Sequence, residues 1–431
     1  MTDRTIRIEV PVLARVEGEG ALELEISNGQ LQDLHLRIYE PPRYFEKFLE
    51  GRAYTEIPDI VARICGICPV AYQMSAVHAI EDIFNLDPGP WVRSMRRLIY
   101  CGEWIESHAL HIHLLAAPDF LGFSNVVELA EKYPDEVRRG LKLQNLGNNI
   151  IRLLGGRSVH PVGVCTGGFT TAPNQNEIEI LLDDLKAGLT EARELIRWSS
   201  QLAFPSVTQE FTSVALRHPD EYPMNEGHIV SSTGLDISID QYREHFIESH
   251  MPHSTALHSH LDGKPYLVGP LARLNINYDK LPDEVKHVLA ETKIQFPSQN
   301  MFHSIIARAA EIYFAMLEAI MLLESYQHPT QSYAEVNPTA GIGYGCTEAP
   351  RGILWHRYEL AKNGDVTSAE IVPPTSQNQA RIEEDLRLSL EALGLDKDDD
   401  KLRLHGETVI RNYDPCISCA THFLKIKVKR N

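Results

Sequence analysis

Cysteine residues form two closely spaced pairs near opposite ends of the chain. Cys65 and Cys68 lie in the segment RICGIC, and Cys416 and Cys419 lie in DPCISC. A C-x-x-C spacing lets two sulfur atoms reach one metal ion. Two such pairs therefore predict a four-thiolate metal site that the fold closes. A structural zinc ion, two iron–sulfur half-sites and a redox dithiol remain open as interpretations of the spacing alone.

Charged residues beside the pairs favour a reactive centre over a structural zinc ion. Arg63 precedes the first pair, Asp414 precedes the second, and His422 follows it. Thiolates need a metal or nearby cations to stay deprotonated, and an arginine can also hold small anionic ligands on a metal. A carboxylate beside the sulfurs can accept a proton. The other cysteines have no partner at motif spacing and are interpreted as packing residues: Cys101, Cys165 and Cys346.

The composition narrows the class of protein around these pairs. The 431 residues are 43 % hydrophobic and 23 % charged, so the chain can bury a sizeable core. The formal net charge of −18 argues against a general nucleic-acid binder. No apolar run is long enough for a membrane span, and the opening segment MTDRTIRIEV lacks the apolar region of a secretory signal. We therefore expect a soluble, acidic, intracellular protein.

The elements that must position the cysteines are expected to be mainly helical. The sequence predicts helices over residues 43–52, 71–84, 91–116, 134–153, 175–202, 284–294, 298–326 and 377–393. Alternating apolar residues predict strands within 6–38, with a turn at Asn28-Gly29, and over 332–336, 353–360 and 369–373. Residues 204–283 are expected to be irregular, and 395–401 to form a solvated acidic loop.

These elements predict one α+β unit over residues 1–431, built around long helices. Its expected parts are an N-terminal β part (1–40), a mainly helical core (41–330), a β and loop part with the C-terminal active-site segment (331–422), and a tail that can be cleaved (423–431). The glycine-containing segment GIGYGC (341–346) lacks the strand–loop–helix context of a dinucleotide site, and there is no Walker loop. A nicotinamide or flavin site is therefore expected on another chain.

The motifs together resemble the large subunit of [NiFe] hydrogenases. The resemblance extends over nearly the whole chain and rests on ARVEGEG (14–20), RYFEKFLEGR (43–52), RICGICP (63–69), LLAAPDFLG (114–122), GGRSVHP (155–161), EAPRG (348–352), VPPTSQN (372–378) and DPCISCATH (414–422). The longer run RICGICPVAYQMSAVHA is similar to the cytoplasmic, bidirectional, NAD(P)-linked group, the sulfhydrogenases. The family fold implied is a central bundle of long helices with small β parts from both ends of the chain.

The resemblance implies a nickel–iron centre that cleaves dihydrogen reversibly and heterolytically. Cys65, Cys68, Cys416 and Cys419 are the implied nickel ligands, with Cys68 and Cys419 bridging to an iron that carries cyanide and carbon monoxide. Soft thiolates suit a redox-active nickel. The residues are thus assigned a catalytic role by the family motifs.

The resemblance leaves two groups open as the base that accepts the proton. One is the thiolate of Cys416, and the other is Arg351, which would need a rigid carboxylate clamp because its pKa ordinarily exceeds 12. Asp119 and Asp414 are implied to form that clamp. Glu17 is implied to be the first carboxylate that relays the proton from Cys416 toward solvent.

The resemblance also implies a second metal site and contacts to the iron's small ligands. Glu46, the backbone carbonyl of Ile371, and His422 match the family's magnesium or iron(II) ligands near the C-terminus. The residues implied to surround the diatomic ligands are Pro374, Thr375 and Ser376, where a hydroxyl would donate to a cyanide nitrogen.

Two departures from the family pattern concern the first cysteine pair and the C-terminus. Tyr72 stands where the family commonly has a histidine, so an outer hydrogen bond from that position is in question. The basic tail FLKIKVKRN (423–431) is present, although a maturation endopeptidase removes this part in most members.

The implied partners follow from the path of the electrons. A small iron–sulfur subunit must receive them, because no cysteines remain here at cluster spacing. Flavin-bearing, diaphorase-type subunits would then reach NAD(P), and the complex would be cytoplasmic. The alternatives are a non-catalytic, hydrogenase-like subunit of a quinone-reducing complex and a structural four-cysteine zinc protein.

Overall fold

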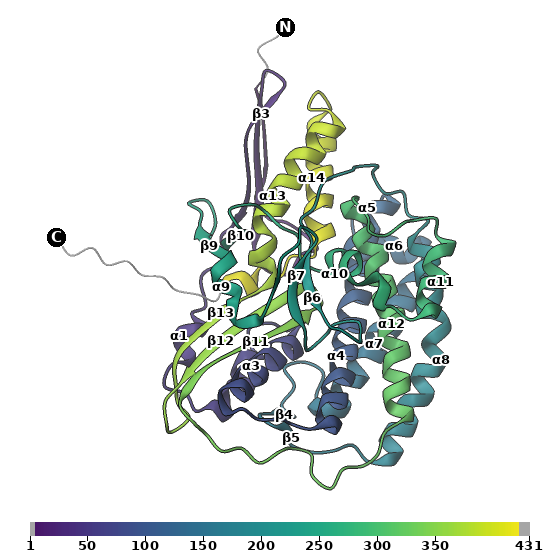
Figure 1. Ribbon diagram of the computed structural model, residues 1–431. Coiled ribbons are helices and arrows are strands. Elements are labelled where there is room, and N and C mark those ends of the chain that lie inside the picture. Colours follow the sequence, from purple (N-terminus) through teal and green to yellow (C-terminus); the bar gives the residue numbers. More distant parts are fainter. Residues whose placement is uncertain (1–4, 422–431) are drawn as a thin grey trace, which may run out of the picture.

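The computed structural model describes residues 5–421. A bundle of long helices stands beside smaller antiparallel sheets, and a narrow sheet at the N-terminus extends away from the body together with a helical pair (Figure 1). The mainly helical α+β class is therefore confirmed. The division into parts at residues 40, 330 and 422 stays a prediction, and the tail at 423–431 lies outside the described residues.

The helices and strands have the following bounds. The helices are α1 (Phe45–Leu49), α2 (Ile57–Val61), α3 (Pro69–Phe84), α4 (Pro90–Leu110), α5 (Ala117–Leu121), α6 (Val126–Lys132), α7 (Pro134–Gly155), α8 (Gln175–Ser199), α9 (Tyr242–His245), α10 (Pro270–Asn277), α11 (Asp283–Glu291), α12 (Ser304–Glu324), α13 (Pro374–Leu393) and α14 (Asp399–Tyr413). The strands are β1 (Thr5–Val10), β2 (Gly20–Ser27), β3 (Gln30–Ile38), β4 (Val164–Cys165), β5 (Gly168–Phe169), β6 (Val214–Arg217), β7 (His228–Ser231), β8 (Asp236–Ile237), β9 (Phe246–His250), β10 (Leu257–Leu261), β11 (Gly341–Ala349), β12 (Gly352–Leu360) and β13 (Val366–Val372).

The central bundle consists of α4, α7, α8 and α12, which pack side by side. At the crossing of α4 and α7, a Cβ on Gly102 would lie 2.9 Å from the carbonyl oxygen of Gly147, and one on Gly147 would lie 2.5 Å from that of Gly102. Only glycine allows the two backbones to approach this closely. The long helix α8 begins at a capping box between Asn174 and Glu177.

The glycine-containing segment 341–346 is part of a strand, and helix α3 packs against it. It begins β11, the first strand of the antiparallel sheet β11–β12–β13, and α3 packs directly against it. A Cβ on Gly345 would lie 2.1 Å from the carbonyl oxygen of Ser75, and one on Gly343 would lie 2.2 Å from that of Ala79. These glycines therefore let the helix that follows Cys68 lie flat on the sheet.

Three sequence-based expectations are wrong. Residues 332–336 form no strand and contribute only an isolated bridge between Tyr333 and Gly168. The expected acidic loop at 395–401 contains the start of α14, because Asp398 caps that helix by accepting from the Lys401 N–H. Residues 204–283 contain five short strands, β6 to β10, together with α9 and α10. Short, mixed polar segments give too little periodicity to predict these elements.

Candidate metal centre

Four buried sulfur atoms meet where the two cysteine segments come together. The Sγ atoms of Cys65, Cys68, Cys416 and Cys419 lie within 4.8 Å of one another, and all four are free cysteines. The Cys65 Sγ is 2.9 Å from the Cys68 Sγ and 3.5 Å from the Cys416 Sγ, while the Cys68 and Cys419 sulfurs are 4.0 Å apart. None of these residues is more than 4 % exposed. The fold thus brings together the four-cysteine set that the sequence predicted.

The first pair sits on the loop that leads into α3. Cys68 is the residue just before the helix, and Pro69 takes the first helical position, where a missing N–H costs nothing. The N–H groups of Val70 and Ala71 donate to Glu103 of α4, at 2.6 and 2.9 Å. This buried carboxylate therefore anchors the helix start beside the cysteines. Burial raises the pKa of Glu103 well above its ordinary value, although the two backbone hydrogen bonds oppose that shift.

The second pair follows the end of α14. Asp414 adopts a left-handed conformation with φ of 55°, which ends the helix and turns the chain toward the first pair. Arg43 links the two cysteine segments, because its Nη2 donates to the carbonyl oxygens of Ile64 and Ser418. Sequence reasoning did not single out Arg43, although it lies within the RYFEKFLEGR motif.

Glu17 lies directly against the second pair. The Cys416 Sγ donates to Glu17 Oε2 at 3.1 Å, and the Ser418 N–H donates to the same oxygen at 3.0 Å. The backbone of residue 17 also forms an isolated parallel bridge with Cys416. Glu17 is half-buried. Its carboxylate therefore lies in hydrogen-bond contact with one thiol of the cluster, and its role as a proton relay stays a prediction.

Arg351 lies beside the cysteines and is clamped by one of its two expected carboxylates. Its Nε donates to the Asp414 carbonyl oxygen at 2.7 Å, and its Nη2 donates to Asp414 Oδ1 at 3.1 Å. Burial by itself would lower the pKa of Arg351, but the charges of Asp414 and Cys416 raise it well above its ordinary value. Nη1 of Arg351 is buried with no hydrogen-bond partner among residues 5–421. This donor is therefore unused by the described residues, in a guanidinium whose charge acts on the cysteine cluster.

Asp119 has different partners from those expected. It forms ion pairs with Arg411, at 2.6 and 2.9 Å, and with Arg15. It thereby ties the last turn of α14 to the N-terminal segment that carries Glu17. The clamp on Arg351 is formed by Asp414, and the described contacts make Asp119 a positioning residue. The motif LLAAPDFLG gives no information about which arginine its aspartate meets.

A buried ion network, missed by sequence reasoning, holds the EAPRG loop that carries Arg351. Arg273 donates to Glu311 at 2.8 Å through both Nε and Nη2, and to Glu348 at 2.9 Å through Nη1. It also donates to the carbonyl oxygens of Ala349 and Pro350, at 2.7 and 3.0 Å. Burial would raise the pKa of Glu311, but Arg273 lowers it to about 2. Burial raises the pKa of Glu348 to about 7 against the opposing effect of Arg273.

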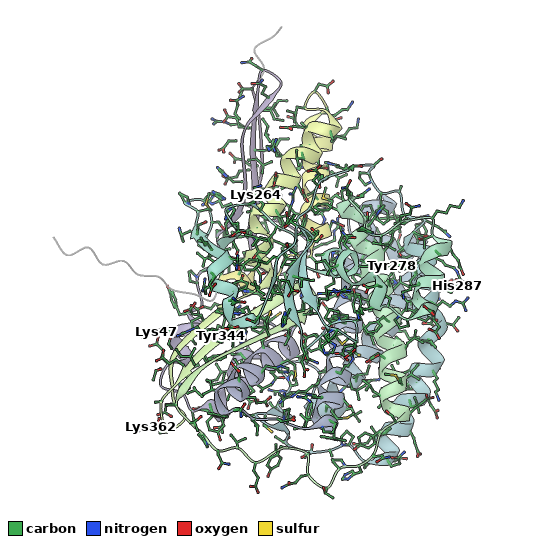
Figure 2. All side chains as sticks on the ribbon, in the orientation of Figure 1. Lys47, Lys264, Tyr278, His287, Tyr344 and Lys362 are labelled. Carbon is green, nitrogen blue, oxygen red and sulfur yellow. The ribbon has the colours of Figure 1, made fainter. Side chains whose placement is uncertain are left out.

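The remaining predicted residues are only partly accounted for. Glu46 Oε1 of α1 accepts from the Ile371 N–H of β13 at 2.8 Å, so these two candidates for the second metal are neighbours. Lys47, labelled in Figure 2, is the residue after Glu46 on α1. His422 lies outside the described residues. Thr375 Oγ1 accepts from the Cys416 N–H at 3.0 Å, while the Ser376 hydroxyl donates to the Pro373 carbonyl at 3.0 Å. Pro374 is the first residue of α13.

The donor set fits a soft transition metal. Burial raises the pKa of Cys416 and of Cys419. At Cys65 the effect of burial is outweighed by hydrogen bonds from the other cysteines and by the charge of Arg351, which lower its pKa. The four thiols are therefore not all thiolates on their own. A bound metal ion changes this, because it holds thiolates deprotonated. The unpartnered Nη1 of Arg351 adds a donor for small anionic ligands at the same centre. The residues present therefore fit a nickel–iron group.

Comparison with known proteins agrees with this geometry. The family model for nickel-dependent hydrogenases matches residues 43–138 and 240–422. Sulfhydrogenase 1 subunit alpha of Pyrococcus furiosus is 34 % identical over 99 % of this chain and 100 % of its own length. Sulfhydrogenase 2 subunit alpha of the same organism is 33 % identical over 97 % of this chain and 100 % of its own length. The structure of an NAD+-reducing [NiFe]-hydrogenase in the H2-reduced state has a TM-score of 0.89 and 26 % identity, covering 97 % of this chain and 99 % of that one.

A buried four-cysteine centre in this fold defines the large subunit of a nickel-containing hydrogenase. The chain belongs to the nickel-dependent hydrogenase family. It is the catalytic subunit of a [NiFe] hydrogenase and thus part of an oxidoreductase. The resemblance noted from the motifs is confirmed. Within residues 5–421, no helix combines the length and the apolar character needed to cross a bilayer.

Proposed function

We propose that the chain catalyses reversible, heterolytic cleavage of dihydrogen at a nickel–iron centre held by Cys65, Cys68, Cys416 and Cys419. Cys68 and Cys419 are assigned as the bridging ligands, and the iron carries cyanide and carbon monoxide. When bound, this centre polarises dihydrogen and takes up its two electrons. The single observation that carries the proposal is the buried cluster of four cysteine sulfurs, with Glu17 hydrogen-bonded to one of them and the charge of Arg351 acting on the cluster.

The chain's own residues move the proton. The hydrogen bond from Cys416 to Glu17 supports Cys416 Sγ as the proton acceptor, because the sulfur already shares a short path with a half-buried carboxylate. The proton then passes to Glu17 Oε2 and toward solvent. Arg351 is fixed by two hydrogen bonds to Asp414, so its role is to hold positive charge beside the sulfurs. A guanidinium held this way stabilises negative charge that develops at the centre.

Thr375 is the better of the two hydroxyl donors to a cyanide. Its oxygen accepts from the Cys416 N–H, which leaves the hydroxyl hydrogen free to donate. Ser376 already donates its hydrogen to the Pro373 carbonyl. Pro374 starts the helix on which both hydroxyls stand. This arrangement supports contact between the start of α13 and the iron's small ligands.

A second ion, Mg²⁺ or Fe²⁺, is proposed near the C-terminus. Glu46, the Ile371 carbonyl and His422 are the candidate ligands. The contact between the Glu46 carboxylate and the Ile371 backbone supports this assignment, since it brings two of the three together. Oxygen donors suit a hard ion such as Mg²⁺.

Partner subunits complete the electron path. The three other cysteines do not cluster: among residues 5–421, the quartet is the only group of three or more thiols with metal-binding spacing. A small iron–sulfur subunit is therefore proposed to receive the electrons. The similarity to sulfhydrogenases and to an NAD+-reducing enzyme supports flavin-bearing diaphorase subunits, NAD(P) as the carrier and a cytoplasmic location. A maturation endopeptidase that removes residues 423–431 is proposed on the family resemblance.

The test uses the matured complex purified without oxygen. We expect one nickel and one iron at the centre, infrared bands from cyanide and carbon monoxide, and hydrogen-dependent reduction of a viologen dye. Cys65→Ser should lose nickel and activity, while Cys101→Ser is the matched control, because Cys101 is equally buried but outside the cluster. Zinc at one per chain without nickel would refute the proposal in favour of a structural site. Absence of both nickel and activity would instead favour a non-catalytic relative.

A further inference from the structure

A second group of side chains that could hold a metal ion lies outside the cysteine cluster. His35 belongs to β3, His253 to the loop between β9 and β10, and Glu383 to α13. One possible ligand atom from each lies within 4.8 Å of the other two. Three segments that are distant in sequence thus converge on one point.

The contacts within the group form a compact set. His253 Nε2 is 2.9 Å from Glu383 Oε1, and His258 Nε2 of β10 is 3.3 Å from Glu383 Oε2. The rings of His35 and His253 stack with centroids 4.1 Å apart. The Leu36 N–H also donates to Glu383 Oε1, at 2.9 Å. The carboxylate is therefore held in one orientation by its neighbours.

The exposure of the three side chains suits an ion-binding site. The side chains of His35, His253 and Glu383 are 31 %, 14 % and 18 % exposed. The group is sheltered yet open to an ion from solvent.

We propose that His35, His253 and Glu383 form a binding site for a divalent transition-metal ion of the Zn²⁺ type. Two imidazoles and one carboxylate are a ligand set that Zn²⁺ uses with a fourth position open to water. Ligand atoms about 2.1 Å from a tetrahedral ion lie about 3.4 Å apart, so an ion would draw these atoms together from separations of up to 4.8 Å and turn the stacked imidazole rings toward itself. His258 holds the outer oxygen of the carboxylate, as supporting residues around metal ligands do.

Binding of an ion at this place would cross-link three parts of the fold. The β3 strand, the 251–256 loop and α13 would share one ligand sphere. The loop is already joined to the end of β3, because the Thr255 N–H donates to the Ile38 carbonyl at 2.8 Å. An ion that binds only the folded state stabilises it by mass action. Zn²⁺ should therefore raise the unfolding temperature.

The experiment titrates Zn²⁺ into the complete nickel-loaded complex after removal of loosely bound metal. Isothermal titration counts the sites and gives Kd, and Co²⁺ absorption reports the coordination geometry. The variants are His35→Ala, which removes the most exposed ligand, and Glu383→Gln, which keeps an oxygen for the Leu36 N–H. The matched control is His228→Ala, since His228 pairs with Asp236 at 2.9 Å without further ligands.

We expect one Zn²⁺ per chain beyond the cysteine centre, with Kd raised more than about tenfold in both variants and unchanged in the control. The unfolding temperature should rise with Zn²⁺ in the wild type and in His228→Ala only. No saturable site in the wild type would overturn the proposal. Equal binding by the wild type and the two variants would also overturn it, and would show that the group is only a set of ion pairs.

Discussion

Replacing Arg273 by lysine should destabilise the protein and disturb Arg351 without touching the metal ligands. Arg273 makes five hydrogen bonds, to Glu311, Glu348 and the carbonyls of Ala349 and Pro350. A lysine has three donors on one nitrogen and cannot span these four partners. At least two hydrogen bonds to a charged group are therefore lost.

The size of the effect follows from burial. Arg273, Glu311 and Glu348 are all 0 % exposed. Carboxylate or carbonyl oxygens that lose a hydrogen bond from residue 273 therefore cannot form one to water instead. Two lost hydrogen bonds to charged groups cost about 3–6 kcal/mol, which is a large part of a typical total stability of about 5–15 kcal/mol. At roughly 2–4 °C per kcal/mol, the unfolding temperature should fall by about 6 °C or more.

Activity should fall as well in the fraction that stays folded. The carbonyls of residues 349 and 350 precede Arg351, and Arg273 is a donor to both. A displaced guanidinium can cost up to about 10²-fold in rate. The assays are thermal unfolding and hydrogen-dependent dye reduction at a temperature well below the transition, with nickel content measured on the same samples.

The control is Arg138→Lys, because Arg138 pairs with Asp135 on the surface, where both side chains are more than 70 % exposed. A surface pair contributes about 0–1 kcal/mol, so this variant should match the wild type. If Arg273→Lys unfolds at the wild-type temperature and turns over at the wild-type rate, the buried network does not position Arg351 and the reasoning fails.

Three further predictions concern the proton path, the helix support and the pH dependence. Glu17→Gln keeps an acceptor for the Ser418 N–H but cannot carry a proton. Activity should therefore fall by about 10²- to 10⁴-fold, while nickel content and stability stay unchanged. Turnover at the wild-type rate would exclude Glu17 from the proton path. Gly345→Ala should lower the free energy of unfolding by about 1–3 kcal/mol, because its Cβ would lie 2.1 Å from a backbone oxygen. The control is Gly341→Ala, whose Cβ meets only a side chain, at 3.1 Å. In denaturant, this control should unfold like the wild type. Because the folded-state pKa of Glu348 is raised to about 7, the stability it contributes is present below the unfolded pKa of about 4.5 and is lost as the pH rises to 7. The difference in unfolding temperature between wild type and Glu348→Gln should shrink over that range, and a constant difference would contradict the assigned pKa.

The wider consequence is that the centre depends on residues that carry none of its chemistry. Glu103 fixes the helix start behind Cys68, Arg43 joins the two cysteine loops, and Asp119 ties α14 to the segment that carries Glu17. Each uses hydrogen bonds in a buried setting, where an unmet partner is costly. Substitutions at these positions are therefore expected to act on metal insertion and geometry together.

Local patterns in the sequence were sufficient for the long helices and for the expectation that the two cysteine pairs meet in one cluster. The apolar periodicity of residues 304–324 and of the other bundle helices is strong, because each buries one broad face. The two C-x-x-C spacings indicated a thiolate site but left the metal open, and the ordered family motifs were needed to favour nickel. The start of α14 was missed, since acidic residues at a helix start look like a solvated loop until the cap is seen.

The sequence alone determined which side chains are candidates for the chemistry. The tertiary structure decided where they lie and which other residues hold them. Cys65 and Cys416 are 351 residues apart, and their contact exists only because α3 lies on β11 while α14 returns to the same place. Sequence spacing also could not predict that Asp119 pairs with Arg15 and Arg411. The same holds for the buried network around Arg273. Spacing fixes geometry within one turn of a helix or loop, whereas contacts between distant segments follow from how whole elements pack.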